Sequence, residues 1–144
     1  MITIAGEFAA RKLKRNRKKF KLKKRIHKLR MLGIQFSKSP LEGAPQAKGV
    51  VLEKRIVEQK QPHSGLIKCV RVKLLKNGKE ITAFLPKTGA VNHVSEHDQV
   101  TVEGVHGSQG GAVGSMHGVK WRVVKVNDIA LEEVRTGRKQ KPTR

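Results

Sequence analysis

Beyond the first third of the chain, short apolar runs alternate with polar positions at the two-residue period of β-strands. Val100 and Val102, for example, alternate with Thr101 and Glu103. Runs of this kind predict five strands, at residues 50–58, 69–75, 80–85, 99–105 and 119–126. Short strands with no strong helix among them predict a mainly β fold, a five-stranded OB-type β-barrel over residues 50–134.

The clearest local signal is the dipeptide Asn77-Gly78, which separates the second and third of these runs. Both positions of a two-residue hairpin turn require positive φ, and Asn and Gly tolerate it best. One face of the hairpin is then apolar throughout, and Pro86 ends its second strand. The expected cross-strand pairs are Lys76 with Lys79, Leu74 with Ile81, Val72 with Ala83 and Val70 with Leu85.

The first third of the chain has helical periodicity instead. Leu22, Ile26 and Leu29 recur at helical spacing and Gly33 is a stop signal, so we expect a helix over residues 7–31. Residues 36–49 hold Ser, Pro and Gly and predict a linker or an extended strap.

The predicted organisation has three parts. A long basic N-terminal arm, helical then extended, covers residues 1–49. The barrel covers residues 50–134, and a short basic tail covers residues 135–144.

Charge indicates the class of partner. With 32 Lys+Arg against 11 Asp+Glu, the net charge of +21 favours a polyanionic ligand, because a lone compact chain would repel itself. No run of 18 apolar residues and no lipidation motif occurs, so nucleic acid is favoured over a membrane. Aromatic residues are scarce, which favours recognition of the backbone and shape of folded RNA over base stacking.

Most of the excess charge lies in the arm, where residues 11–30 include 13 basic residues and no acid. Cations on nearly every side oppose a helix in isolation, so we expect it to order when phosphates neutralise it. A solvated basic tail or a nuclear-localisation patch are the alternatives, although neither needs an apolar stripe. The candidate RNA-binding residues are Arg11, Lys12, Lys14, Arg15, Arg17, Lys18, Lys19, Lys21, Lys23, Lys24, Arg25, Lys60, Lys68, Arg71, Lys73 and Lys120.

Two loops carry further candidate contacts. Residues 61–65 offer a rigid proline, a hydroxyl and amide groups, which suit sugar and phosphate, although ordinary polar turns use the same residues. Residues 104–118 hold six glycines, which let backbone amides approach a ligand. Residues 88–119 contain no Lys or Arg, however, so this stretch is predicted to be a flexible loop reaching between partners.

The sequence argues against an enzyme. It has no GxxxxGK[ST] motif, no nucleophile elbow and no outstanding carboxylate pair. His93, His97, His106 and His117 are better explained as scattered surface residues than as metal ligands, because their segment is not convincingly helical. We therefore expect no catalytic residue, metal or cofactor. The single cysteine, Cys69, excludes an internal disulfide and fits a reducing, cytoplasmic location.

Several motifs carry a family resemblance. They are Gly49-Val50-Val51-Leu52-Glu53-Lys54, Lys60-Gln61-Pro62, Lys68-Cys69-Val70-Arg71-Val72, Lys76-Asn77-Gly78-Lys79, Ile81-Thr82-Ala83-Phe84-Leu85-Pro86, Glu96-His97-Asp98 and Val123-Val124-Lys125-Val126. Together they closely resemble small-subunit ribosomal protein twelve, called protein twenty-three in eukaryotic numbering. Residues 9–14 and 40–45 resemble its archaeal form, and the similarity covers almost the whole chain.

The resemblance implies an OB barrel at the decoding centre of the ribosome, with its arm threaded into small-subunit ribosomal RNA. It also implies loops near the codon–anticodon helix and elongation factors, and contacts with other small-subunit proteins. In eukaryotic relatives the proline that matches Pro62 can be hydroxylated, and its state here is open. The loop residues carried over by motif are Gln61, Pro62, His63, Ser64 and Gly65, and Ser115, Met116, His117 and Gly118 with Lys120.

The chain departs from the family at these loop tips. The family's Pro-Asn-Ser-Ala is Pro62-His63-Ser64-Gly65 here, and its Asp-(Ile/Leu)-Pro-Gly-Val-Arg is Ser115-Met116-His117-Gly118-Val119-Lys120. A basic residue or histidine usual near Gly111 is also missing. Lysine keeps the charge of the family's arginine but loses its planar fork. Three functions stay open: a structural subunit protein that still supports accurate decoding, a specialised paralogue in dormant or variant ribosomes, and a free OB-type RNA chaperone or translation factor.

Overall fold

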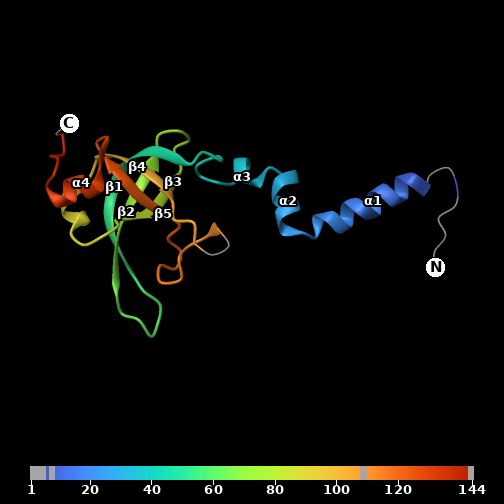
Figure 1. The fold of residues 1–144 in the computed structure, drawn as a ribbon, viewed down its shortest axis with the longest axis horizontal. Coiled ribbons are helices and arrows are strands. Elements are labelled where there is room, and N and C mark those ends of the chain that lie inside the picture. Colours follow the sequence, from blue (N-terminus) through green and yellow to red (C-terminus); the bar gives the residue numbers. More distant parts are fainter. Residues whose placement is uncertain (1–5, 7–8, 108–109, 143–144) are drawn as a thin grey trace. The chain divides into compact units, whose positions relative to one another are not determined.

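The computed structural model describes residue 6, residues 9–107 and residues 110–142 (Figure 1). The chain divides into two compact units, Met1–Gly43 and Ala44–Arg144. The first unit contains helices and the second contains the sheet. No helix among the described residues is long and apolar enough to cross a membrane.

The second unit is a closed, mainly antiparallel barrel. Within the described residues its strands are β1 (Gln46–Glu58), β2 (Leu66–Leu74), β3 (Glu80–Phe84), β4 (Gln99–Gly104), β5 (Trp121–Val126) and β6 (Ile129–Ala130). They pair in the order β3-β2-β1-β4-β5-β6, and a parallel pairing of β3 with β5 closes five of them into a ring. The predicted mainly β fold is confirmed.

Small elements without a clear sequence signal complete this unit. They are the two-residue strand β6, the 3₁₀ helix η1 (Ala90–His93) and the helix α4 (Leu131–Thr136). Helix α4 buries Leu131 and Val134. Two apolar positions in six residues are too few to form a recognisable periodic pattern, which is why α4 was not expected.

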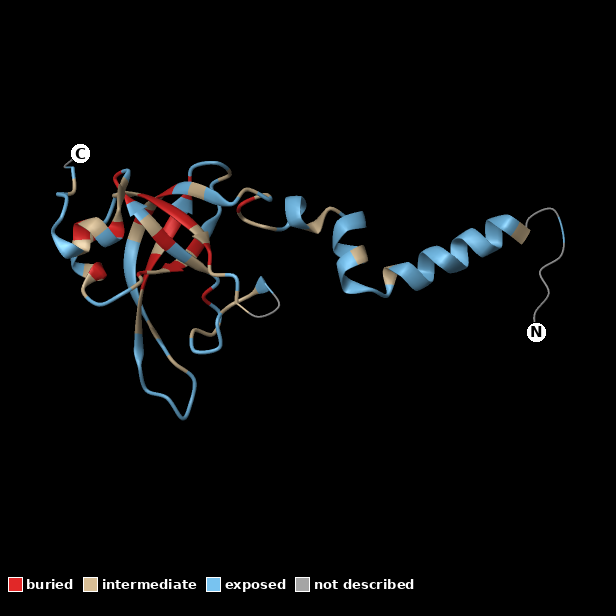
Figure 2. Cartoon of the chain, viewed as in Figure 1, coloured by how far each residue is buried: buried red, intermediate tan, exposed pale blue. Residues whose placement is uncertain are grey.

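The buried residues lie mainly on the strands of the barrel (Figure 2), and most of the buried apolar ones are valines. Val51, Val72, Val102 and Val123, which come from four different strands, are completely buried. Branched side chains pack well on a pleated surface, so a small barrel can be filled without aromatic residues.

Gly49 lies where β1 pairs with two neighbours, opposite Leu74 of β2 and Val100 of β4. A Cβ atom at this position would overlap the side chain of Val72 and lie 2.8 Å from the backbone oxygen of Lys73. The close approach of β2 to β1 therefore requires glycine here.

The expected hairpin register is wrong by two residues. The structure pairs Val72 with Ile81 and Val70 with Ala83. The Gly78 N–H donates to the Leu74 oxygen at 2.9 Å, and only Gly78 in this turn has positive φ, so the connection is longer than a two-residue turn. Side chains alternate with a period of two, so a two-residue shift leaves the apolar face unchanged.

The first unit has three helices, α1 (Ala9–Leu22), α2 (Arg25–Met31) and α3 (Ile34–Ser37). The single helix expected over residues 7–31 is therefore wrong, and residues 7–8 lie outside the described part. Lys24 is extended at the break. Neither helix has a buried residue, so no packing contact holds the two segments in one continuous helix.

The requirement for glycine at position 49 can be tested by measuring the stability of the barrel. We expect Gly49→Ala to lower the free energy of unfolding by about 1–3 kcal/mol, because backbone of β2 must move to admit a methyl group. Urea unfolding followed by Trp121 fluorescence measures this. Gly111→Ala is the matched control, since a Cβ there meets nothing within 4 Å, and a change of more than about 0.5 kcal/mol is not expected. Equal stabilities of the two variants would contradict this account of the β1–β2 contact.

Candidate nucleic-acid interface

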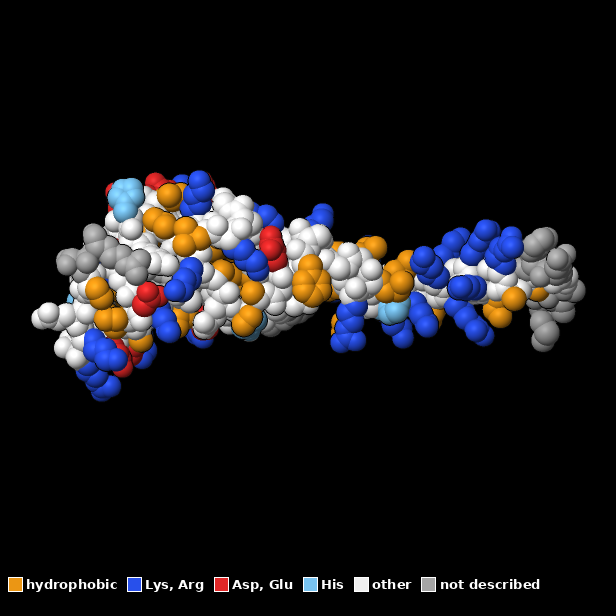
Figure 3. Space-filling model, turned by 90° about the horizontal axis from the view of Figure 1, so that it is seen from above, with side chains coloured by type: hydrophobic (Ala, Val, Ile, Leu, Met, Phe, Trp, Pro, Cys, Tyr) orange, Lys and Arg blue, Asp and Glu red, His pale blue; other side chains and the backbone are white. Residues whose placement is uncertain are grey.

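The arm helices α1 and α2 present their cations to solvent (Figures 2 and 3). All the candidate RNA-binding residues from Arg11 to Arg25 are exposed, and the two helices bury no residue. Neither helix contains an acidic residue. The two helices therefore supply no carboxylate of their own to pair with these cations.

In the barrel, unlike in α1 and α2, many of the Lys and Arg side chains form ion pairs with carboxylates. Lys48 lies 3.1 Å from Asp128, and Arg122 donates from Nε to Glu103 at 2.6 Å. Further pairs are Lys87–Glu132 at 2.9 Å, Lys139–Glu133 at 3.0 Å and Lys141–Asp98 at 2.7 Å. Hydrogen bonds from Arg135 and Lys87 lower the pKa of Glu132 to about 2, which shows how strongly cations surround this carboxylate.

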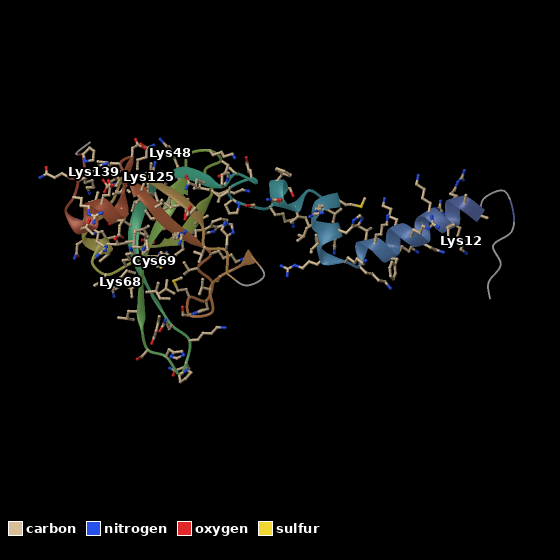
Figure 4. All side chains as sticks on the ribbon, viewed as in Figure 1. Lys12, Lys48, Lys68, Cys69, Lys125 and Lys139 are labelled. Carbon is tan, nitrogen blue, oxygen red and sulfur yellow. The ribbon has the colours of Figure 1, made fainter. Side chains whose placement is uncertain are left out.

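The barrel residues predicted to bind RNA fall into two groups. Arg71 donates from Nη1 to Thr82 Oγ1 at 3.0 Å, and its Nε lies 3.5 Å from Glu80 Oε2. This arginine therefore links β2 to β3 and is partly neutralised. Lys60, Lys73 and Lys120 are exposed, whereas Lys68 is half-buried. Lys68 lies next to the buried Cys69 on β2 (Figure 4).

The loop between β1 and β2 closes on its own backbone. The Gln59 N–H donates to the Gly65 oxygen at 3.0 Å, and the His63 N–H donates to the Lys60 oxygen at 2.9 Å. The side chains at its tip, Gln61, Pro62, His63 and Ser64, are all exposed. The base of the loop is therefore fixed by backbone hydrogen bonds, and the polar groups at its tip are accessible to a partner.

The loop between β4 and β5 is closed in the same way. The Val105 N–H donates to the Lys120 oxygen at 2.9 Å, and the Met116 N–H donates to the Val113 oxygen at 3.0 Å. Ser115 and Gly118 are exposed, while Met116 and His117 are half-buried. Within the described part, His117 Nδ1 is buried and has no hydrogen-bond partner. Residues 108–109 of this loop lie outside the described residues.

One side chain joins the two loops. Gln59 Nε2 donates to the backbone oxygen of Ser115 at 3.2 Å, across 56 positions of sequence. Sequence reasoning missed Gln59, because a glutamine at the end of a strand has no motif that indicates a distant partner.

Among the described residues, no group of three or more His, Cys, Asp and Glu is placed to hold a metal ion. Burial raises the pKa of the Cys69 thiol to about 11, so it stays protonated at neutral pH and is a poor nucleophile.

The basic tail is held against the barrel. Lys141 reaches both Asp98 and, at 3.3 Å, the hydroxyl of Ser95, while Asn127 Nδ2 donates to the Pro142 oxygen at 3.0 Å. Residues 143–144 of the expected tail lie outside the described part. Lys139 and Lys141 therefore serve the fold as well as contributing charge.

The family assignment rests on residues 34–144, which match the family described as Ribosomal protein S12/S23. The match includes the entire barrel and both loops. The chain belongs to the ribosomal protein S12/S23 family. It is thus a structural, non-enzymatic component of the small ribosomal subunit that binds ribosomal RNA and is involved in decoding fidelity, and its ring of strands is the OB-type barrel that was expected. Helices α1 and α2 precede the matched region of this S12/S23 protein.

The Asp98 contacts predict a pH dependence of stability. Burial alone would raise the pKa of Asp98, but hydrogen bonds from Lys141 and the Ser95 N–H outweigh it and hold the pKa below its ordinary value of 3.8. A lowered carboxyl pKa stabilises the fold above the unfolded pKa, and the contribution is lost as pH falls through the folded pKa.

We therefore expect Asp98→Asn to destabilise the protein by about 1–2 kcal/mol at pH 7, with the difference from wild type shrinking between about pH 5 and pH 2. Urea unfolding across this range measures it, and Glu96→Gln, a change at an exposed carboxylate, is the control. A difference that stays constant with pH would rule out the ionised carboxylate as its source.

Proposed function

We propose that the basic arm of this S12/S23 protein binds small-subunit ribosomal RNA through its phosphates. The supporting observation is the uneven neutralisation of charge. The exposed cations of α1 and α2 belong to helices without acids, whereas carboxylates of the barrel pair with many of its cations. A free cation releases condensed counterions when it meets a phosphate, and an ion-paired cation must first give up its partner.

The two loops are the second part of the proposal. Residues 61–65 and 115–118, with Lys60 and Lys120 beside them, lie near the codon–anticodon helix and support accurate decoding. Their exposed polar groups and backbone-closed bases support this role. Lys68 and Lys73 of the barrel are proposed to contact RNA. Arg71 can contact RNA only if it gives up its ion pair with Glu80 for one with a phosphate. Elongation factors and other small-subunit proteins are the proposed neighbours.

The altered tips also bear on the specialised-paralogue alternative. The family has an asparagine where this chain has His63. The asparagine amide can both donate and accept a hydrogen bond, and a neutral imidazole can also do both. This conserved capacity favours a protein that works in translating ribosomes. A high-salt sucrose gradient separates the possibilities, because a working subunit protein accompanies polysomes, a dormant-ribosome paralogue is confined to idle ribosomes, and a free factor remains at the top.

Neutralising the arm tests the RNA-binding role. We expect strong loss of incorporation into small subunits when five lysines of α1 become glutamine, since five phosphate contacts lose their charge while helix propensity is kept. The substituted residues are Lys12, Lys14, Lys18, Lys19 and Lys21. Mass spectrometry of gradient fractions gives the amount incorporated.

The control for this variant is the same five positions changed to arginine, which keeps the charge and should incorporate normally. If the glutamine variant incorporates as well as the arginine variant, the arm does not anchor the protein through these charges.

Restoring the family's residue at the first tip tests the loops. We expect His63→Asn to change the frequency of misreading by roughly 2- to 12-fold with incorporation unchanged, because the amide places its donor and acceptor at different points from the imidazole and so changes one net hydrogen bond. A misreading reporter in cells that carry only the variant measures this. Glu96→Gln, exposed but outside both loops, serves as control. Unchanged misreading in both His63→Asn and His63→Ala would remove this loop from the decoding contacts.

A further inference from the structure

Gln59 occupies an unusual place at the base of the first loop. It directly follows β1, and its N–H closes that loop by donating to the Gly65 oxygen at 3.0 Å. Its backbone is thereby fixed at the end of a strand. The side chain is half-buried and points its Nε2 toward Ser115, 3.2 Å from the backbone oxygen of that residue.

Gly65 makes room for this arrangement. A Cβ atom at position 65 would overlap Gln59 Oε1 and would lie 3.0 Å from its Cδ. The obstructing atoms are the end of a flexible side chain, so an alanine at 65 would displace the amide rather than the backbone. The predicted consequence is loss of the contact with Ser115, which lies 50 positions away in the sequence.

Among the described residues of the second loop, the other backbone hydrogen bonds lie at its base and in local turns. The Val105–Lys120 backbone bond and the buried Val119 fix the base of the loop, and the bond from the Met116 N–H to the Val113 oxygen forms a local turn. No proline stiffens residues 113–118. The Gln59 amide is therefore a constraint on the tip that comes from outside the loop.

We propose that Gln59 is a positioning residue that couples the two loops, with Gly65 as the space that the coupling requires. Its relevance to decoding rests on the function proposed above. The tips at 61–65 and 115–118 then present their polar groups in a fixed mutual arrangement, and a change at Gly65 acts on both tips at once. Losing one net hydrogen bond should shift the local opening of the second loop by roughly 2- to 12-fold.

Amide hydrogen exchange on the full-length chain tests the coupling directly. The central variant is Gln59→Glu, which keeps the shape of the side chain and replaces its N–H donor with an acceptor that faces the Ser115 oxygen. We expect exchange at Met116 to accelerate by roughly 2- to 12-fold in this variant and in Gly65→Ala. The double variant should be no faster than either single one, because both changes remove the same contact.

Three controls make the result specific. His63→Ala removes a side chain at the first tip without touching the contact, so it should leave Met116 exchange unchanged. The thermal midpoint of the barrel should be the same in all variants, which separates positioning from general destabilisation. Gln59→Lys is the rescue: it returns a nitrogen donor to the long side chain and should restore part of the protection.

Unchanged Met116 exchange in both Gln59→Glu and Gly65→Ala overturns the coupling, as does an additive double variant. Misreading assays then separate this inference from the proposed function. If His63→Asn alters misreading and Gln59→Glu does not, the coupling has no role in decoding although the first loop does. If Gln59→Glu alters both exchange and misreading, the coupling is supported. If exchange changes while no loop substitution alters misreading, the decoding role of the loops is refuted and the physical coupling remains.

Discussion

Repulsion among 32 Lys and Arg side chains, with only 11 Asp and Glu to offset them, is the constraint that this chain must meet. The charged side chains are divided between the two units of the chain, and each unit has a different balance of cations and acids. In the barrel, carboxylates such as Asp98, Glu103 and Glu132 lie against cations around a closed sheet with a valine core. In the arm, α1 and α2 contain cations without acids and bury no residue. We propose that a phosphate-rich partner offsets the repulsion among these cations.

The barrel in turn determines what the loops can do. Its ring is closed by the β3–β5 pairing, and Gly49 lets β2 approach β1 closely. Both long loops start and finish on strands of this ring, and each is closed at its base by a backbone hydrogen bond. Their tips are therefore polar groups on a stiff support. A stiff support suits a family that is involved in decoding fidelity, because small displacements of a contact to RNA change how accurately a codon is decoded.

Much of this could be predicted from the sequence, because it depends on local patterns. Period-two alternation identified the long strands, and the family motifs identified the barrel and its loops. The features that could not be predicted depend on contacts between residues distant in the sequence, or lie where the sequence has no turn or cap residue to mark them. The hairpin at Asn77-Gly78 kept its apolar face but not its register, since a two-residue shift changes no face. The break at Lys24 has no glycine or proline to mark it. The bond from Gln59 to Ser115 joins two segments that share no motif.

The central claim is that the arm, and not the barrel, supplies most of the phosphate contacts. It is tested most directly by the salt dependence of binding to small-subunit ribosomal RNA, compared between the full chain and a chain that begins at Ala44. Each phosphate contact contributes roughly 0.7–0.9 to the slope of log affinity against log salt concentration. The account predicts that removing the arm eliminates the larger part of that slope while a folded barrel remains. An equal slope for the two chains would contradict it and would assign the phosphate contacts to the barrel.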